Sequence, residues 1–177
     1  MVMHLDFSTD IVVSANIINI FEQDKTKDSI TFKNTGFETD TAFINGQEVQ
    51  LGQYLEDNAV DLKRPLVADY MGAMINVSFR DIDPKTKKVR FYAPVFPDVT
   101  YKLAKPFDNY EKQFEQALKS HQIKDPLFAC NCILNFLYAN LEGKTIGNIT
   151  SPMTFGEIAY MLLNQTFVYI SLEKKKS

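Results

Sequence analysis

The dipeptide Asn45-Gly46 is the feature that most constrains how this chain can fold. Asparagine and glycine tolerate the two positive φ angles of a type I′ turn, which joins two twisted antiparallel strands with a two-residue loop. The residues on either side, 41–44 and 47–49, are predicted to form those short strands. The sequence therefore predicts a β-hairpin, and with it an antiparallel sheet.

Apolar periodicity predicts further strands. β-branched residues favour a strand over residues 10–20, and alternation favours a short one over residues 29–32. Two longer strands are predicted at residues 73–79 and 89–96, with a solvated loop between them. The polar break at residues 69–72 is expected to be a bulge or a turn that leads into the first of these two strands.

Three helices are predicted. A short one covers residues 51–58, where apolar side chains recur at helical spacing. A longer one covers about residues 109–120, with Asp108 as its N-cap and Glu111 in a capping box. The apolar run at residues 127–141 is expected to begin as a strand through about Cys130. It should then continue as a buried helix that ends near residue 143.

These elements predict one α+β domain with a mostly antiparallel sheet and two or three helices. The domain is expected to span residues 1–173, followed by a disordered basic tail at residues 174–177. No apolar stretch approaches the roughly 18 residues needed to cross a bilayer, and the N-terminus lacks the features of a secretory signal. The two cysteines are only one residue apart, so both are expected to be thiols in a reducing cytoplasm.

The composition and motifs give no sign of an enzyme or of a nucleic-acid-binding protein. The formal net charge is −3, and the basic residues between positions 80 and 90 are diluted by Asp81 and Asp83. There is no phosphate loop, nucleophile elbow, dinucleotide fingerprint or zinc motif. The two histidines, His4 and His121, are poorly placed for catalysis. We therefore expect no enzymatic activity, no metal or cofactor, and no nucleic-acid or membrane partner.

Polar residues interrupt the apolar runs in the last quarter of the chain. Glu157 follows Gly156 inside a run that resembles a buried strand, and Asn164 precedes a second run that contains Thr166. An unpaired buried carboxylate costs several kcal/mol, so Glu157 needs a partner or a purpose. Cys130 is a further candidate, because a helix N-terminus following its strand would lower the pKa of its thiol.

Three short stretches, Phe128-Ala129-Cys130, Gly156-Glu157-Ile158 and Asn164-Gln165-Thr166, resemble in order and spacing the C-terminal part of FIST domains. Upstream, Pro65-Leu66-Val67 lies where that family has a Pro-Leu motif. The family often has an arginine three residues after the cysteine, where this chain has Ile133. The resemblance implies an α+β intracellular sensory module that binds small ligands such as amino acids. Some family members bind haem, but neither histidine lies in the matched segment.

The leading hypothesis is therefore a cytoplasmic, non-catalytic, small-molecule-binding sensory domain that acts in signal transduction. Its expected ligand-binding residues are Glu157, Asn164, Cys130, Gly156 and Thr166, and its ligand would be an amino acid or an amine. The alternative for Glu157 and Asn164 is that they satisfy backbone groups of nearby loops. Two other functions stay open. One is a protein-interaction module that forms a homodimer through an exposed sheet edge, and the other is an enzyme with a cysteine nucleophile.

Overall fold

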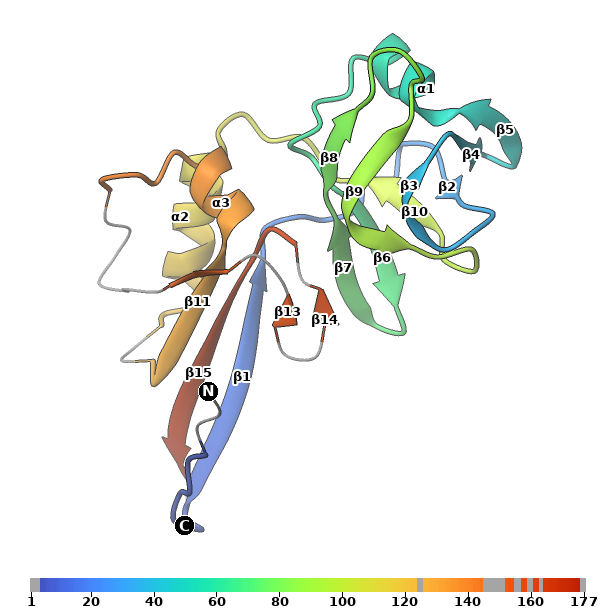
Figure 1. Ribbon diagram of the computed structural model, residues 1–177. Coiled ribbons are helices and arrows are strands. Elements are labelled where there is room, and N and C mark those ends of the chain that lie inside the picture. The colour runs from blue at the N-terminus through green and yellow to red at the C-terminus, as the bar shows by residue number, and fades with distance from the viewer. Residues whose placement is uncertain are drawn as a thin grey trace.

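Strands dominate the structure, a computed structural model that describes residues 4–123, 126–144, 152–154, 157–158, 161–162 and 164–175 (Figure 1). The helices within these residues are α1 (Leu51–Asp57), α2 (Tyr110–Ser120) and α3 (Ile133–Tyr138). The strands are β1 (Ile11–Asn19), β2 (Ile30–Thr31), β3 (Gly36–Thr39), β4 (Thr41–Ile44), β5 (Gln47–Gln50), β6 (Leu66–Tyr70), β7 (Ala73–Val77), β8 (Phe79–Ile82), β9 (Val89–Val95), β10 (Tyr101–Leu103), β11 (Phe128–Cys132), β12 (Met153–Thr154), β13 (Glu157–Ile158), β14 (Met161–Leu162) and β15 (Thr166–Lys174).

The strands form two lobes (Figure 1). In the first lobe, a six-stranded sheet with the order β5-β4-β2-β10-β6-β7 is accompanied by a three-stranded sheet with the order β3-β9-β8. In the second lobe, a four-stranded sheet with the order β1-β15-β11-β12 is accompanied by α2 and α3. All of these strand pairs are antiparallel except β11 with β12. The predicted α+β class is confirmed.

The Asn45-Gly46 hairpin is confirmed. Asn45 has φ 50° and Gly46 has φ 84°, and Ile44 pairs with Gln47 across the two-residue turn. The polar break before β7 is a second turn of this kind, with positive φ at Met71 and Gly72. The first turn follows from local backbone chemistry, because asparagine and glycine readily enter the left-handed region. In the second turn only Gly72 has this preference.

Each lobe has its own hydrophobic core. The core of the first lobe includes the fully buried side chains of Leu51, Leu55, Phe79 and Tyr101, so α1 packs against the strands through one face. In the second lobe, Phe114 and Leu118 of α2 pack against residues of the β1-β15-β11 sheet, among them Ile18, Ala129, Phe167 and Tyr169. The i, i+4 spacing of Phe114 and Leu118 explains the confirmed helix.

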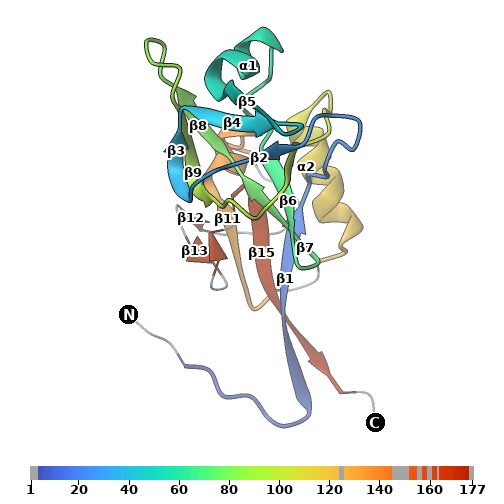
Figure 2. The same ribbon diagram turned by 90° about the vertical axis from the view of Figure 1, so that its right-hand side faces the viewer.

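β1 and β15 form a long antiparallel ribbon that runs beyond both lobes, most clearly in Figure 2. Their register extends from Ile18↔Phe167 near the lobes to Ile11↔Lys174 at the far end, and the Lys175 amide donates to the Asp10 carbonyl at 2.8 Å. The predicted disordered tail from residue 174 is therefore wrong for Lys174 and Lys175, because Lys174 pairs with Ile11 of β1 and Lys175 bonds to Asp10, the residue before β1. Residues 176–177 lie outside the described part.

Element boundaries differ from the predictions in three places. α2 begins one residue later than expected, and Asn109, not Asp108, is its N-cap, since the Asn109 side chain accepts from the Lys112 amide at 2.8 Å. The predicted strand over residues 73–79 breaks at Ser78, so that its two parts join different sheets. α3 ends at Tyr138 instead of near residue 143.

No helix among the described residues is long and apolar enough to cross a membrane.

Gly52 is expected to resist substitution because of a close backbone approach. A Cβ atom at this position would lie 2.1 Å from the carbonyl oxygen of Lys87. Gly52→Ala should therefore lower the free energy of unfolding by about 1–3 kcal/mol, even though alanine favours helices, because backbone must shift to relieve the clash. Urea denaturation measures the change. Gly36→Ala is the control, with its nearest contact at 3.4 Å, and it should change stability by less than about 0.5 kcal/mol. Equal effects of the two substitutions would contradict the prediction.

Candidate functional site

A chain of hydrogen bonds between polar side chains joins the two lobes. We call it the polar junction, and its members are Asn19, Asn76, Ser78, Tyr110, Asn131, Asn135, Asn164 and Gln165. Most of these side chains are buried. Among the described residues, no buried side-chain nitrogen or oxygen lacks a hydrogen-bond partner, as the cost of leaving one unpaired requires.

Gln165 is the centre of the polar junction. Its Oε1 accepts from the Ser78 hydroxyl at 2.6 Å, and its Nε2 donates to the Tyr110 hydroxyl at 3.0 Å. The same Nε2 donates to the carbonyl oxygen of Lys63 at 2.9 Å. Gln165 is 1% exposed. Its backbone φ is 51°, a value that residues other than glycine adopt only at a cost in free energy. The three amide contacts hold Gln165 in this conformation.

Asn164 extends the polar junction toward the first lobe. Its Oδ1 accepts from the backbone amide of Ser78 at 3.1 Å, and its carbonyl oxygen accepts from Asn76 Nδ2 at 3.0 Å. Asn76 and Asn19 exchange a reciprocal pair of amide hydrogen bonds, both 2.9 Å long. These contacts explain why the strand breaks at Ser78, whose amide is satisfied from the other lobe instead of by a neighbouring strand.

Tyr110 extends the polar junction into the second lobe. Its hydroxyl donates to Asn135 Oδ1 at 2.7 Å, and Asn135 Nδ2 donates to Asn131 Oδ1 at 2.9 Å. Burial strongly raises the pKa of the Tyr110 hydroxyl. The hydroxyl therefore stays protonated at neutral pH and can act as a donor and an acceptor at the same time.

The structure places the predicted site residues in different surroundings. Asn164 belongs to the polar junction, and Thr166 is buried beside it and pairs with Asn19 in the β1–β15 ladder. Glu157 is part of β13, where it pairs with Leu162. The Glu157 side chain and Gly156 lie outside what the structure describes.

Cys130 lies among apolar side chains and not with Asn164. It packs with Ile75 of the first lobe and with Val168, its neighbour on β15. Both Cys130 and Cys132 are buried free thiols, as predicted. The expected lowering of the Cys130 pKa is wrong, because α3 begins only at Ile133 and burial raises the pKa of the thiol.

Sequence reasoning missed most of the polar junction. Gln165 lies between the predicted site residues Asn164 and Thr166 but is not among them, and the strand predicted over residues 73–79 includes Asn76 and Ser78 without a role for either. The signal was present, since both are polar residues inside an otherwise apolar run, as Glu157 is. The apolar ring of Tyr110 fits the helical spacing of α2, but that spacing gives no information about its hydroxyl.

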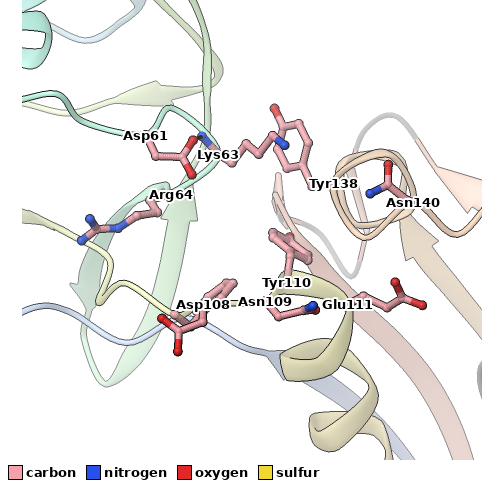
Figure 3. Close-up of a pocket in the computed structure, with 10 residues that line it drawn as sticks. Asp61, Lys63, Arg64, Asp108, Asn109, Tyr110, Glu111, Tyr138 and Asn140 are labelled. Carbon is pink, nitrogen blue, oxygen red and sulfur yellow. Dashed lines mark hydrogen bonds between the residues drawn. The ribbon is translucent and has the colours of Figure 1, made fainter.

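A pocket of about 280 Å³ opens beside the polar junction, between the two lobes (Figure 3). We call it the junction pocket. Its lining comes from the loop before β6, from the start of α2 and its preceding loop, and from the end of α3 and the residues after it. The lining residues are Asp61, Lys63, Arg64, Phe107, Asp108, Asn109, Tyr110, Glu111, Tyr138 and Asn140. Tyr110 belongs to both the pocket and the polar junction.

The charges of the junction pocket differ in how they are held. The Arg64 guanidinium donates to the Ala104 carbonyl, and Glu111 pairs with Lys144 at 2.7 Å. The Lys63 ammonium lies 5.8 Å from the centre of the Tyr138 ring, within range of a cation–π interaction. The Asp108 carboxylate makes no hydrogen bond or ion pair with any residue that the structure describes. Lys63 and Asp108 are thus the two charges most available to a ligand.

A second hollow, of about 360 Å³, lies between α1 and β8. Its charged side chains already pair with one another or with neighbours, Glu56 with Lys87 at 2.7 Å and Arg80 with Asp81 at 3.5 Å. Within the described part of the chain, no group of three or more His, Cys, Asp or Glu side chains is arranged to hold a metal ion. The junction pocket is therefore the better candidate for a binding site.

The basic residues between positions 80 and 90 are largely matched by carboxylates. Besides the two pairs above, Lys88 lies 3.0 Å from Glu38, and Arg90 lies 2.5 Å from Asp81. Exposed pairs of this kind contribute little to stability, but they offset the positive charge of the loop.

The chain matches a family of unknown function (DUF6976) over residues 1–173, and it belongs to that family. No curated protein and no solved structure matches the chain. The expected FIST relationship is therefore wrong: the match covers nearly the whole chain and is to a different family. The three stretches that suggested it are short, and apolar strands bounded by small polar residues occur in many folds.

Removing the Tyr110 hydroxyl should destabilise the protein. Tyr110→Phe leaves the buried Asn135 Oδ1 without its donor and removes one acceptor from Gln165, so the free energy of unfolding should fall by about 1–3 kcal/mol. Tyr92→Phe is the matched control, because the Tyr92 side chain is 43% exposed and lies outside the polar junction. Chemical denaturation of both variants gives the comparison, and a Tyr110→Phe effect no larger than the control would show that the hydroxyl is dispensable.

Cys130 should react slowly with alkylating reagents. Its thiol is 3% exposed and its pKa is raised, so little thiolate is present at neutral pH and little of it is accessible. Iodoacetamide should modify native protein far more slowly than urea-unfolded protein, and peptide mass spectrometry can follow Cys130 separately from Cys132. Rapid modification of Cys130 in the native state would instead favour a cysteine nucleophile.

Proposed function

We propose that this protein is a non-catalytic, small-molecule-binding sensory protein whose ligand occupies the junction pocket. The observation that carries the proposal is a pocket of about 280 Å³ with walls from both lobes and accessible charges of both signs. Pockets between structural units that combine aromatic walls with a few placed polar groups are the usual form of small-molecule sites.

The lining favours a small zwitterion, such as an amino acid. Lys63 offers a positive charge to a ligand carboxylate, and Asp108 offers a negative charge to a ligand amine. The rings of Phe107 and Tyr138 provide apolar surface for the remainder of the ligand. An amine without a carboxylate would use Asp108 alone and should bind less tightly.

The proposed location differs from the predicted one around Glu157. Both the side-chain oxygen and the carbonyl oxygen of Asn164 are already used within the polar junction, and Cys130 lies in an apolar cluster. These contacts support a structural role for Asn164. Gln165, the next residue, lies behind the junction pocket and links its two walls through Lys63 and Tyr110.

Ligand binding between the lobes would also give a means of sensing. A ligand that contacts Lys63 from the first lobe and Asp108 near α2 favours whichever arrangement of the lobes best satisfies both contacts. A change in this arrangement could then be read by a partner. We propose that the protein acts in the cytoplasm, where the two buried thiols stay reduced.

Thermal shift with a panel of amino acids and amines tests the proposal. A ligand at about 100 times its dissociation constant should add about 2.7 kcal/mol and raise the melting temperature by several degrees. Lys63→Met and Asp108→Asn should each reduce this shift, the first for carboxylate-bearing ligands only and the second for all amines. Lys112→Met is the control, because this exposed lysine belongs to the same end of α2 but does not line the pocket.

The proposal fails if no compound shifts the native protein. It fails equally if a shift persists unchanged in both pocket variants while they remain folded.

A further inference from the structure

Among the described residues, no strand pairs with the outer edge of β1. β1 is the terminal strand of the sheet β1-β15-β11-β12. The Lys175 amide donates to the Asp10 carbonyl, so Asp10 and every second residue after it direct their backbone groups toward β15. The backbone groups of Val13, Ala15 and Ile17 therefore point outward, away from the sheet.

The outer edge lacks the features that usually prevent strands from pairing. Edge strands are commonly short, or interrupted by proline, or protected by charged side chains. β1 is nine residues long and contains neither a proline nor a charged residue. Figure 1 and Figure 2 show that its N-terminal half lies in the ribbon beyond the lobes.

The sequence of β1 is complementary to itself. Its nine residues are IVVSANIIN, with Ala15 in the middle. When the strand is turned end to end about Ala15, Val13 falls opposite Ile17, Val12 opposite Ile18, and Ser14 opposite Asn16. Over residues 12–18, β-branched residues therefore meet β-branched residues and polar residues meet polar ones, while Ile11 falls opposite Asn19 at each end.

We propose that β1 pairs in antiparallel orientation with β1 of a second copy of this chain, with the two Ala15 residues opposite each other. In this register, the residues whose backbone groups point away from β15 in one strand lie opposite the corresponding residues of the other strand. Ala15 with Ala15, and Val13 with Ile17, then exchange both of their backbone hydrogen bonds. A two-fold axis through the Ala15–Ala15 pair closes the assembly as a dimer.

Side-chain exposure agrees with a second copy as the occupant. Val13 and Ile17 are 45% and 46% exposed, and both lie on the face of the sheet opposite Ile18 and α2. In the dimer each packs directly against its counterpart, and cross-strand pairs of β-branched residues stabilise sheets. A foreign strand would need the same uncharged pattern, whereas a second copy supplies it by symmetry.

Opposite charges at position 15 provide the test. Light scattering after size exclusion should show a dimer for the native chain. Ala15→Lys and Ala15→Glu should each halve the measured mass, because like charges then face each other across the axis. An equimolar mixture of the two variants should restore the dimer. Leu172→Lys is the matched control: Leu172 lies opposite Val13 on the same face, but one strand in from the edge, so this variant should remain dimeric.

A cysteine cross-link gives a second readout that requires little change of side-chain size. The Cα atoms of such a hydrogen-bonded pair lie about 5.5 Å apart, within the range of a disulfide. Oxidised Ala15→Cys should run as a covalent dimer, and Leu172→Cys should not. A monomeric native chain, a dimeric Ala15→Lys variant, a mixture that stays monomeric, or an Ala15→Cys variant that does not cross-link would each overturn the proposal.

Discussion

The arrangement of the two lobes depends on the buried amide of Gln165. This amide contacts Ser78 and Lys63 of the first lobe and Tyr110 of the second. Each buried polar group left without a hydrogen-bond partner would cost about 1–3 kcal/mol, so all members of the polar junction must find their partners together. Apolar contacts between the lobes, such as that of Ile75 with Cys130, tolerate small displacements, whereas hydrogen bonds fix direction and distance.

The same contacts shape the junction pocket. Tyr110 and Lys63 both line it, and Gln165 holds the hydroxyl of one and the backbone of the other. The Lys63 side chain is then free to lie over the Tyr138 ring. A wall held by hydrogen bonds suits a binding site, since little of the wall must be ordered when a ligand enters.

Local features of the fold could be predicted from the sequence, and distant ones could not. Asn45-Gly46 determines its own turn through backbone preference, so the hairpin was found. The break at Ser78 depends on Asn164, 86 positions further along the chain, and no local pattern contains that information. The capping residue of α2 was missed by one position, because Asp108 and Asn109 are both good caps and only the path of the preceding loop decides between them. The polar junction was missed because its members were considered one at a time.

The β1–β15 ribbon belongs to the fold of the single chain at its base and to the proposed dimer interface toward its free end. Two strands alone are at best marginally stable in water, and the end of this ribbon extends beyond the cores that stabilise its base. Its nine matched pairs keep it in register, since a slip of one residue would move Ile18 out of the α2 interface and expose it. At the free end no such interface exists, and Val13 and Leu172 stay exposed. A second β1 strand would complete the ribbon where the chain itself supplies no further strand, and would leave the polar junction at its base unchanged.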